Sequence, residues 1–354
     1  MFKNIKIIVL IFICIVSQFL IIIPISSIST NEIESIKNQN IISWFNSQDI
    51  SEMIKKVNES KLSLYIKNIQ DFGPHPTEST TIEKLKTYLF NEFFNMPINV
   101  TYHSWDYEDR YGENIVATLP GKASSNEVII CAHYDSVAVS PGADDDGSGV
   151  AAVLMMASIL CQYSFNSTIK FILFSGEEQG CLGSLIYATE SKEKNINIIS
   201  VLALDKIGYA ETAGEGTILR HHADSASSWM IDITENLSKE YKNEIKLNVL
   251  RLPYDASSDH RSFIKQGYTG SNFVESSLNP YYHTSEDTLE HMNITYLAKI
   301  CCLATGTIAT IAQGNSELKN DDITISILGK NNNPYQAKLS IHVQNKNIHL
   351  TQQI

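Results

Sequence analysis

The sequence predicts an α/β sandwich built around a mostly parallel sheet. Three short apolar runs, at 128–132, 169–174 and 198–204, contain almost no polar residues, which is typical of strands buried on both faces. Segments of helical length, at 148–159 and 182–190, separate these runs. This alternation favours parallel strands that are joined by helical crossovers.

The same alternation extends on both sides of the three runs. Residues 51–96 predict two amphipathic helices, separated at 71–76 by a turn with two prolines that no helix crosses. The elements expected after the third run are strands at 216–220, 246–251 and 270–274 and helices at 226–240, 259–265 and 293–313.

Changes in composition mark the boundaries of this domain, which we place at 51–316. Residues 30–50 are polar and lack periodicity, so they are expected to form a linker. Residues 317–354 are expected to form a short β-rich C-terminal extension, because isoleucines alternate with polar residues from Ile323 to Ile327.

Residues 1–29 have the pattern of a secretory signal peptide or of an N-terminal membrane anchor. Lys3 and Lys6 precede an apolar stretch at 7–23, which Pro24 ends. The stretch is rather long for a signal peptide and rather short for a membrane span of ~20 residues, so both alternatives stay open. In either case the lysines stay inside, and the rest of the chain is expected to be secreted or extracytoplasmic.

The net charge bears on the expected partners, and the cysteine spacing bears on disulfide bonds. The formal net charge is -12 and there is no cluster of Lys and Arg, which disfavours binding to a nucleic acid. A membrane is expected as a partner only through an uncleaved anchor. The six cysteines, one of them in the apolar stretch, lack the regular spacing of a disulfide framework.

The first candidate site residues follow the run at 128–132. The carboxyl ends of parallel strands carry the functional loops of α/β sheets. His133 and Asp135 are two residues apart, so on an extended chain they share a face, and the carboxylate is placed to orient the imidazole. An isolated His-x-Asp pattern is more often structural, so this pair needs support from elsewhere in the chain.

A loop of three consecutive acids precedes the helix expected at 148–159. Asp144, Asp145 and Asp146 lie between glycines, and adjacent carboxylates repel one another unless a cation compensates them. The alternatives are a solvated acidic loop and a helix N-terminus that favours acids. An EF-hand is excluded, since its loop places acids at alternating positions.

Acids also follow the other two buried runs. Glu177 and Glu178 come after one run, Asp205 directly follows the other, and His283 lies in a turn before the final helix. Three neighbouring strand ends that each finish in His, Asp or Glu are poorly explained as ordinary polar loops. Histidine and carboxylate ligands suit zinc, with cobalt or manganese as substitutes, and five ligands suit two ions better than one tetrahedral ion.

Together these motifs resemble the zinc peptidase family of the secreted bacterial leucyl aminopeptidases, glutamate carboxypeptidase and glutaminyl cyclase. The resemblance covers about residues 55–315 and implies a three-layer α/β/α sandwich with a mixed, mostly parallel central sheet. The motifs that carry it are His133-Tyr134-Asp135, Pro141 to Gly149, Gly176-Glu177-Glu178, Leu204-Asp205, Ser258-Asp259-His260 and Asn279 to Thr284.

The resemblance also implies the metal ligands. Asp145 is expected to bridge two zinc ions. His133 and Asp205 are expected to complete one metal site, and Glu178 and His283 the other.

Two further residues receive catalytic roles from the same resemblance. Glu177 is the expected general base, which takes a proton from water at the metals and later gives one to the leaving amine, and Asp135 is expected to orient His133. The expected protein is therefore an exported zinc aminopeptidase that uses a metal-bridging hydroxide on peptide substrates.

The sequence departs from the family pattern at two places. Asp255 stands where the secreted aminopeptidases often have a tyrosine near the oxyanion, with Tyr254 beside it. Lys206 follows Asp205 where an apolar residue is common, and strand alternation predicts that it points away from the site. The neighbouring pair His221–His222 matches no motif and is expected on the surface.

Three alternatives stay open. A glutaminyl cyclase works with one zinc and does not need the acidic triplet. A carboxypeptidase needs arginines for substrate carboxylates, and Arg251 and Arg261 flank the expected site loops. The third alternative is a receptor-like ectodomain that kept the fold and lost the catalytic activity. The presence of all five expected ligands and of Glu177 argues against it.

Overall fold

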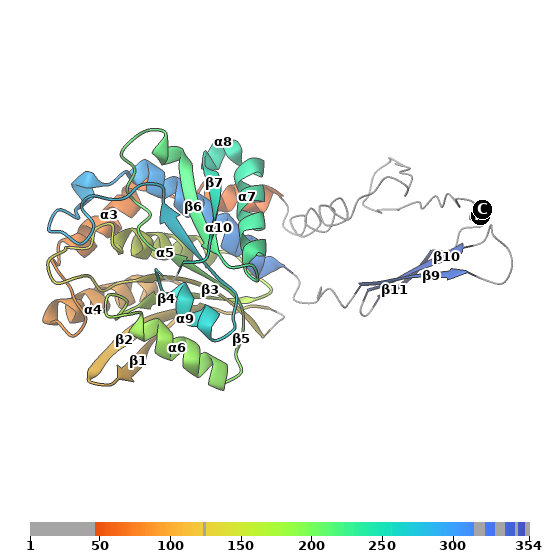
Figure 1. The fold of residues 1–354 in the computed structure, drawn as a ribbon, viewed down its shortest axis with the longest axis horizontal. Helices are drawn as coiled ribbons and strands as arrows, with labels where there is room; N and C mark the ends of the chain where they lie inside the picture. The colour runs from red at the N-terminus through yellow and green to blue at the C-terminus, as the bar shows by residue number, and fades with distance from the viewer. Residues whose placement is uncertain are drawn as a thin grey trace.

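An eight-stranded mixed sheet forms the centre of the fold (Figure 1). The computed structural model describes residues 47–122, 125–255 and 257–314, and the backbone of three further strands after residue 322. The strand order is β1-β2-β4-β3-β5-β8-β6-β7. These strands are β1 (Asn99–Tyr107), β2 (Arg110–Leu119), β3 (Asn126–His133), β4 (Thr168–Phe174), β5 (Asn197–Leu204), β6 (Ile218–Ala223), β7 (Asn248–Pro253) and β8 (Gly270–Glu275).

The pairing of the strands confirms a mixed, mostly parallel sheet. β4, β3, β5 and β8 are parallel neighbours, and β6 and β7 are parallel to each other. β6 runs antiparallel to β8, and β1 and β2 form an antiparallel hairpin that joins the sheet beside β4. This hairpin is not among the predicted elements, because β1 is an edge strand with mostly exposed side chains and therefore has no long apolar run.

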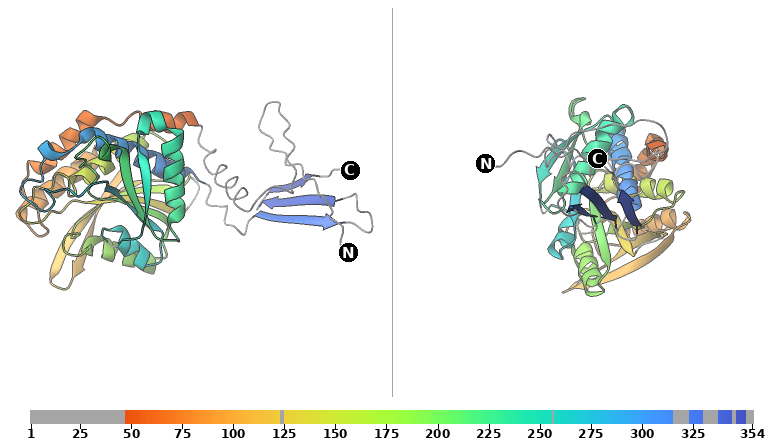
Figure 2. Two further views of the ribbon diagram at one scale, coloured as in Figure 1. Left: turned by 45° about the horizontal axis from the view of Figure 1, so that its top comes forward. Right: turned by 90° about the vertical axis from the view of Figure 1, so that its right-hand side faces the viewer.

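Helices cover both faces of the sheet, which confirms the three-layer architecture (Figures 1 and 2). The helices that pack on one face are α2 (Ser47–Ile54), α3 (Glu59–Gln70), α4 (Thr80–Phe94), α5 (Gly147–Leu160), α7 (Ser228–Glu240), α8 (Lys242–Ile245) and α10 (Ile294–Gln313). The helices on the opposite face are α6 (Leu182–Glu193) and α9 (His260–Lys265).

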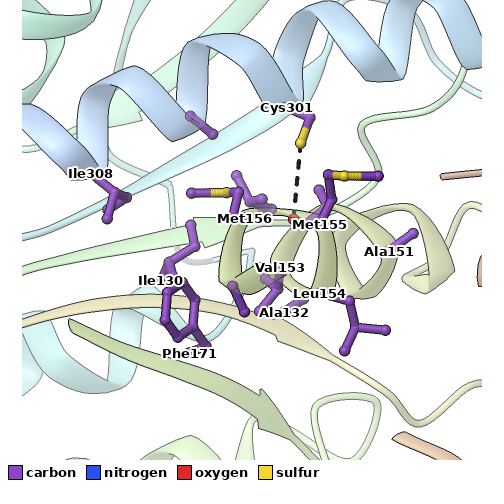
Figure 3. Packing of buried hydrophobic residues seen from close by; sticks show 14 of the residues in the cluster. Ile130, Ala132, Ala151, Val153, Leu154, Met155, Met156, Phe171, Cys301 and Ile308 are labelled. Carbon is purple, nitrogen blue, oxygen red and sulfur yellow. Dashed lines mark hydrogen bonds between the residues drawn. The ribbon is translucent and has the colours of Figure 1, made fainter. Parts of the chain in front are cut away.

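Strand alternation distributes the apolar side chains between two cores. On β3, Val128 and Ile130 belong to the larger core, whereas Ile129 and Cys131 belong to the smaller core under α6 and α9. In the larger core, the methionines of α5 lie between the sheet and Cys301 of α10 (Figure 3). The central strands are thus buried on both faces, as their apolar runs predict.

α2 extends the predicted pattern towards the N-terminus, and α10 lies where a helix was predicted. α2 begins at Ser47, before the predicted domain boundary at residue 51, because Ile50, Met53 and Ile54 are buried in the larger core. Among the helices that the structure describes, only α10 has the length and apolarity of a membrane span. α10 is packed inside the domain, as expected for the core helix of an α/β fold.

The expectation that His221 and His222 lie on the surface is wrong. β6 lies between β8 and β7 inside the sheet rather than at its edge, and the two histidines are 0% and 8% exposed. His221 packs its ring edge against Phe273, with the centroids 4.6 Å apart. His222 Nδ1 lies 3.0 Å from the Pro253 carbonyl oxygen and 3.1 Å from Asp255 Oδ2.

The structure describes three strands near the C-terminal end of the chain but not the N-terminal segment. β9 (Ile323–Gly329), β10 (Ala337–Val343) and β11 (Lys346–Leu350) form an antiparallel three-stranded sheet. The predicted signal or anchor, and the linker as far as residue 46, lie outside the described residues.

The first turn of α5 approaches the end of β5 closely at Gly149. A Cβ atom there would lie 2.5 Å from the Leu204 carbonyl oxygen and 2.5 Å from Asp146 Oδ1. We expect Gly149→Ala to lower the free energy of unfolding by about 1–3 kcal/mol, because the backbone of β5 must move. Denaturant unfolding followed by circular dichroism measures this loss.

Gly306→Ala is the matched control for that substitution. Gly306 lies inside α10, and an added Cβ would meet no heavy atom closer than 3.6 Å. This variant should be neutral or more stable by up to about 1 kcal/mol, because alanine favours the helix. An equal loss in both variants would contradict the close approach at β5.

Candidate metal centre and active site

Three parallel strand ends bring the candidate residues to one edge of the sheet. β3 lies between β4 and β5, so the residues that follow these strands are neighbours in space. His133 ends β3, Glu177 and Glu178 follow β4, and Asp205 directly follows β5. The loop between β8 and α10 adds His283.

Asp145 lies between two imidazoles and presents one carboxylate oxygen to each of them. His133 Nε2 is 3.3 Å from Asp145 Oδ1, and His283 Nε2 is 3.1 Å from Asp145 Oδ2. Glu178 lies on the His283 side, with its Oε2 3.1 Å from His283 Nε2. Ligand atoms of His133, Asp145 and Asp205 also lie within 4.8 Å of one another. All five predicted ligands therefore gather in two groups that share Asp145.

The chemistry of these groups fits a metal ion. Each group offers one imidazole nitrogen and two carboxylates, a donor set that suits zinc. Asp145 Oδ2 is buried and faces only the imidazole of His283, 3.1 Å away, without a well-aligned hydrogen bond among the described residues, so both atoms can serve as ligands. When bound, zinc would supply Lewis acidity and would acidify a water molecule at the site.

Asp146, the third acid of the triplet, holds the surrounding backbone together. Its Oδ2 accepts a hydrogen bond from the His133 N–H at 3.1 Å. Its Oδ1 accepts from the N–H groups of Gly149, at 3.1 Å, and Lys206, at 3.2 Å. One buried carboxylate thus ties the ends of β3 and β5 to the start of α5.

Asp144 anchors the triplet to other loops, and Asp287 supports it from outside. Asp144 Oδ1 accepts from the Gly208 N–H at 2.8 Å, and its Oδ2 accepts from Asn279 Nδ2 at 2.7 Å. Asp287 accepts hydrogen bonds from the N–H groups of Asp144, at 2.9 Å, and Asp145, at 3.2 Å. Burial, reinforced by the charge of Asp144, raises the pKa of Asp287 to about 7. Asp287 is not among the predicted site residues, and the sequence marks it only as an acid four residues after His283.

Asp135 holds different groups from those expected. The His133 Nδ1 donor lies 3.0 Å from the backbone carbonyl of Asp135, whereas its distance to Asp135 Oδ1 is 3.8 Å. The carboxylate instead accepts hydrogen bonds from the N–H groups of Glu177 and Glu178, both at 3.2 Å, and from Thr77 Oγ1 at 3.2 Å. The side chain of Asp135 therefore orients the Glu177–Glu178 segment, and its main chain orients the imidazole.

Glu177 adjoins the candidate ligands without belonging to either group. It follows a turn at Gly176, where φ is +76° and a Cβ would lie 2.8 Å from the Trp105 ring. The Cys181 thiol donates to Glu177 Oε1 at 3.1 Å. Burial raises the pKa of the Glu177 carboxyl, although the charge of His133 opposes this shift. A partly desolvated carboxylate beside a metal site has the character of a general base.

The expectation that Lys206 points away from the site is wrong. β5 ends at Leu204, and Lys206 has a φ of +52°, so strand alternation does not reach it. Its Nζ lies 2.6 Å from Asp205 Oδ1 and 3.7 Å from Asp145 Oδ1. Burial opposes the positive charge, but these two carboxylates raise the pKa of Lys206 above its usual value.

A family comparison covers the segment that holds these residues. The model of peptidase family M28 matches residues 114–306, which is more than half of the 354 residues and includes β3, β4, β5 and every candidate ligand. The chain belongs to peptidase family M28.

Relatives of this M28 chain include named aminopeptidases. It is 34% identical over 188 residues to aminopeptidase YwaD of Bacillus subtilis, which covers 51% of this chain and 40% of YwaD. It is 26% identical over 293 residues to leucine aminopeptidase 1 of Paracoccidioides brasiliensis, covering 75% and 74% of the two chains. The fold matches that of BSAP, a zinc aminopeptidase from Bacillus subtilis, with a TM-score of 0.66, 16% identity and coverage of 74% and 99%.

His75 supports the site from the loop between α3 and α4. Its N–H donates to Ser136 Oγ at 3.0 Å, and its carbonyl accepts from the Ser136 N–H at 3.3 Å. The imidazole is 1% exposed, and its Nδ1 donates to the Gly73 carbonyl at 2.7 Å. Burial lowers the pKa of His75 to about 4.

The lowered pKa of His75 predicts acid sensitivity of the fold. Between pH 6.5 and 4 the unfolded chain binds a proton at His75 and the folded chain does not, so stability falls as pH falls. At pH 5.5 this residue should cost about 1.3 kcal/mol relative to pH 7.5. Unfolding of wild type and His75→Gln, in the same chelating buffer at both pH values, measures the difference. An equal pH dependence in both proteins would show that His75 does not contribute.

Proposed function

We propose that this chain is an exported aminopeptidase with two zinc ions, cobalt or manganese being substitutes, that releases N-terminal residues from peptides. One observation carries the proposal: Asp145 directs its two oxygens to His133 and His283, which belong to different ligand groups. A carboxylate shared in this way is the arrangement that a two-metal site requires. Zinc aminopeptidases among the structural neighbours support the choice of metal.

In this proposal the protein's own groups move the protons. Glu177 accepts a proton from the attacking water and passes one to the nitrogen of the leaving amine. The Asp135 carboxylate holds the backbone of this segment, so Glu177 keeps its position beside the ligand groups. Two bound zinc ions would polarise the scissile carbonyl and stabilise the charge that develops on it.

Charge favours the amino end of the peptide over the carboxyl end. The site gathers carboxylates, whereas the two arginines near the expected loops are engaged elsewhere. Arg251 pairs with Asp232 and Glu235 of α7, and Arg261 donates to the Gly180 carbonyl at 2.7 Å. An ammonium beside the scissile bond is therefore favoured, and a substrate carboxylate is disfavoured.

Blocking the substrate amine tests this assignment. We expect an N-acetylated leucyl amide to lose about one to two decades in kcat/KM relative to the free amine, because a charge-assisted, partly desolvated contact is lost. A dipeptide and its C-terminal amide form the control pair and should be cleaved similarly. A requirement for the free carboxylate would assign a carboxypeptidase, and cyclisation of N-terminal glutamine without cleavage would assign a glutaminyl cyclase.

Substitution of the proposed general base tests the mechanism. We expect Glu177→Gln to lower kcat by about 10²–10⁴-fold while zinc content and thermal stability stay unchanged, since Glu177 lies outside the ligand groups. Glu178→Gln is the matched contrast, because this neighbour is a proposed ligand and its loss should lower zinc content. Near-normal turnover of Glu177→Gln would assign the base to another group.

A further inference from the structure

A lysine side chain lies inside the candidate metal centre, on one side only. The Lys206 ammonium is 2.6 Å from Asp205 Oδ1 and 3.7 Å from Asp145 Oδ1, the oxygen that faces His133. In the part of the chain that the structure describes, no Lys or Arg nitrogen forms such an ion pair with Glu178, whose partner is His283. The two ligand groups therefore share Asp145 but differ in charge.

The position of Lys206 is determined by its surroundings. Its N–H is fixed by Asp146 Oδ1, and its left-handed backbone turns the side chain towards Asp205. The side chain is 23% exposed, and the ammonium lies 4.8 Å from the centroid of the Tyr282 ring. The aromatic face provides a second place for the ammonium on the open side of the site.

We propose that Lys206 makes the two metal positions unequal, so that zinc fills the Asp145–Glu178–His283 group first and binds the His133–Asp145–Asp205 group more weakly. This inference rests on the proposed two-zinc function. In this inference Lys206 acts through its charge on Asp205 and Asp145 and does not contact the reacting bond.

A zinc ion in the His133 group and the ammonium of Lys206 would compete for the same carboxylates. A cation that enters the His133 group uses the same oxygens that Lys206 already neutralises, and it must stay near a positive charge or displace it towards Tyr282. A cation that enters the His283 group meets no such ion pair at Glu178. In the metal-free protein, Lys206 compensates two buried acids that otherwise repel each other, so it stabilises that state.

Zinc titration by calorimetry tests the inference with chelator-stripped full-length protein. Wild type should bind two equivalents in two steps of different affinity. In Lys206→Met the weaker step should tighten by about 10-fold or more, because the competing charge is gone, while the stronger step stays unchanged. Asp205→Asn should remove the weaker step, and His283→Ala should remove the stronger one.

Lys170→Met provides the matched control. Lys170 is also partly buried and ion-paired, with its Nζ 2.9 Å from Glu127 Oε2, but it lies on β4 away from the ligand groups. Its substitution should leave both zinc steps unchanged. A second readout is thermal unfolding of the stripped proteins, in which Lys206→Met should melt below wild type and regain stability on addition of zinc.

The possible failures are distinguishable. Two zinc equivalents with identical isotherms in wild type and Lys206→Met would overturn the inference and leave the proposed function standing. Tightening of the stronger step would also overturn it. A stripped wild type that binds one equivalent or none would overturn the two-zinc function, and the inference with it.

Discussion

The arrangement of this molecule depends on the burial of three adjacent acids where three strand ends meet. A buried carboxylate is stable only when hydrogen-bond donors or cations satisfy it. Asp146 is satisfied by backbone N–H groups at the ends of β3 and β5, and Asp144 by Gly208 and Asn279. These hydrogen-bond partners lie on different segments, so the bonds to Asp144 and Asp146 hold those segments together. Asp145, between them, faces the imidazoles of His133 and His283.

The same constraint explains the support around the site. The acids are held only if α5 starts close to β5, which requires a glycine at position 149. The backbone of the triplet is also held in place by Asp287, whose carboxylate accepts hydrogen bonds from the N–H groups of Asp144 and Asp145. Asp135 does the same for the segment after β4. The residues proposed to hold metal therefore rest on other carboxylates that bind backbone, which keeps the ligands preorganised.

Charge is distributed unevenly across the site. Its surroundings are acidic, but the ammonium of Lys206 compensates the side formed by β3 and β5, while the side formed by Glu178 and His283 lacks an equivalent partner in the described chain. In a site that shares one carboxylate between two groups, the charge on one side alters the affinity of that side more than the other, because electrostatic interactions fall with distance.

The sequence by itself determined the features that depend on local patterns. Apolar runs defined the central strands, small residues defined α5, and the acids and histidines after strand ends identified the five residues that now gather in two groups. Only the tertiary structure decided where individual side chains point. Lys206 turns inward because its backbone leaves the strand, and His221 is buried because its ring packs against Phe273 on the neighbouring strand β8. Asp287 acts on Asp145 across 142 positions of the chain. Such contacts join segments that are brought together by folding, so no periodicity or spacing within one segment encodes them.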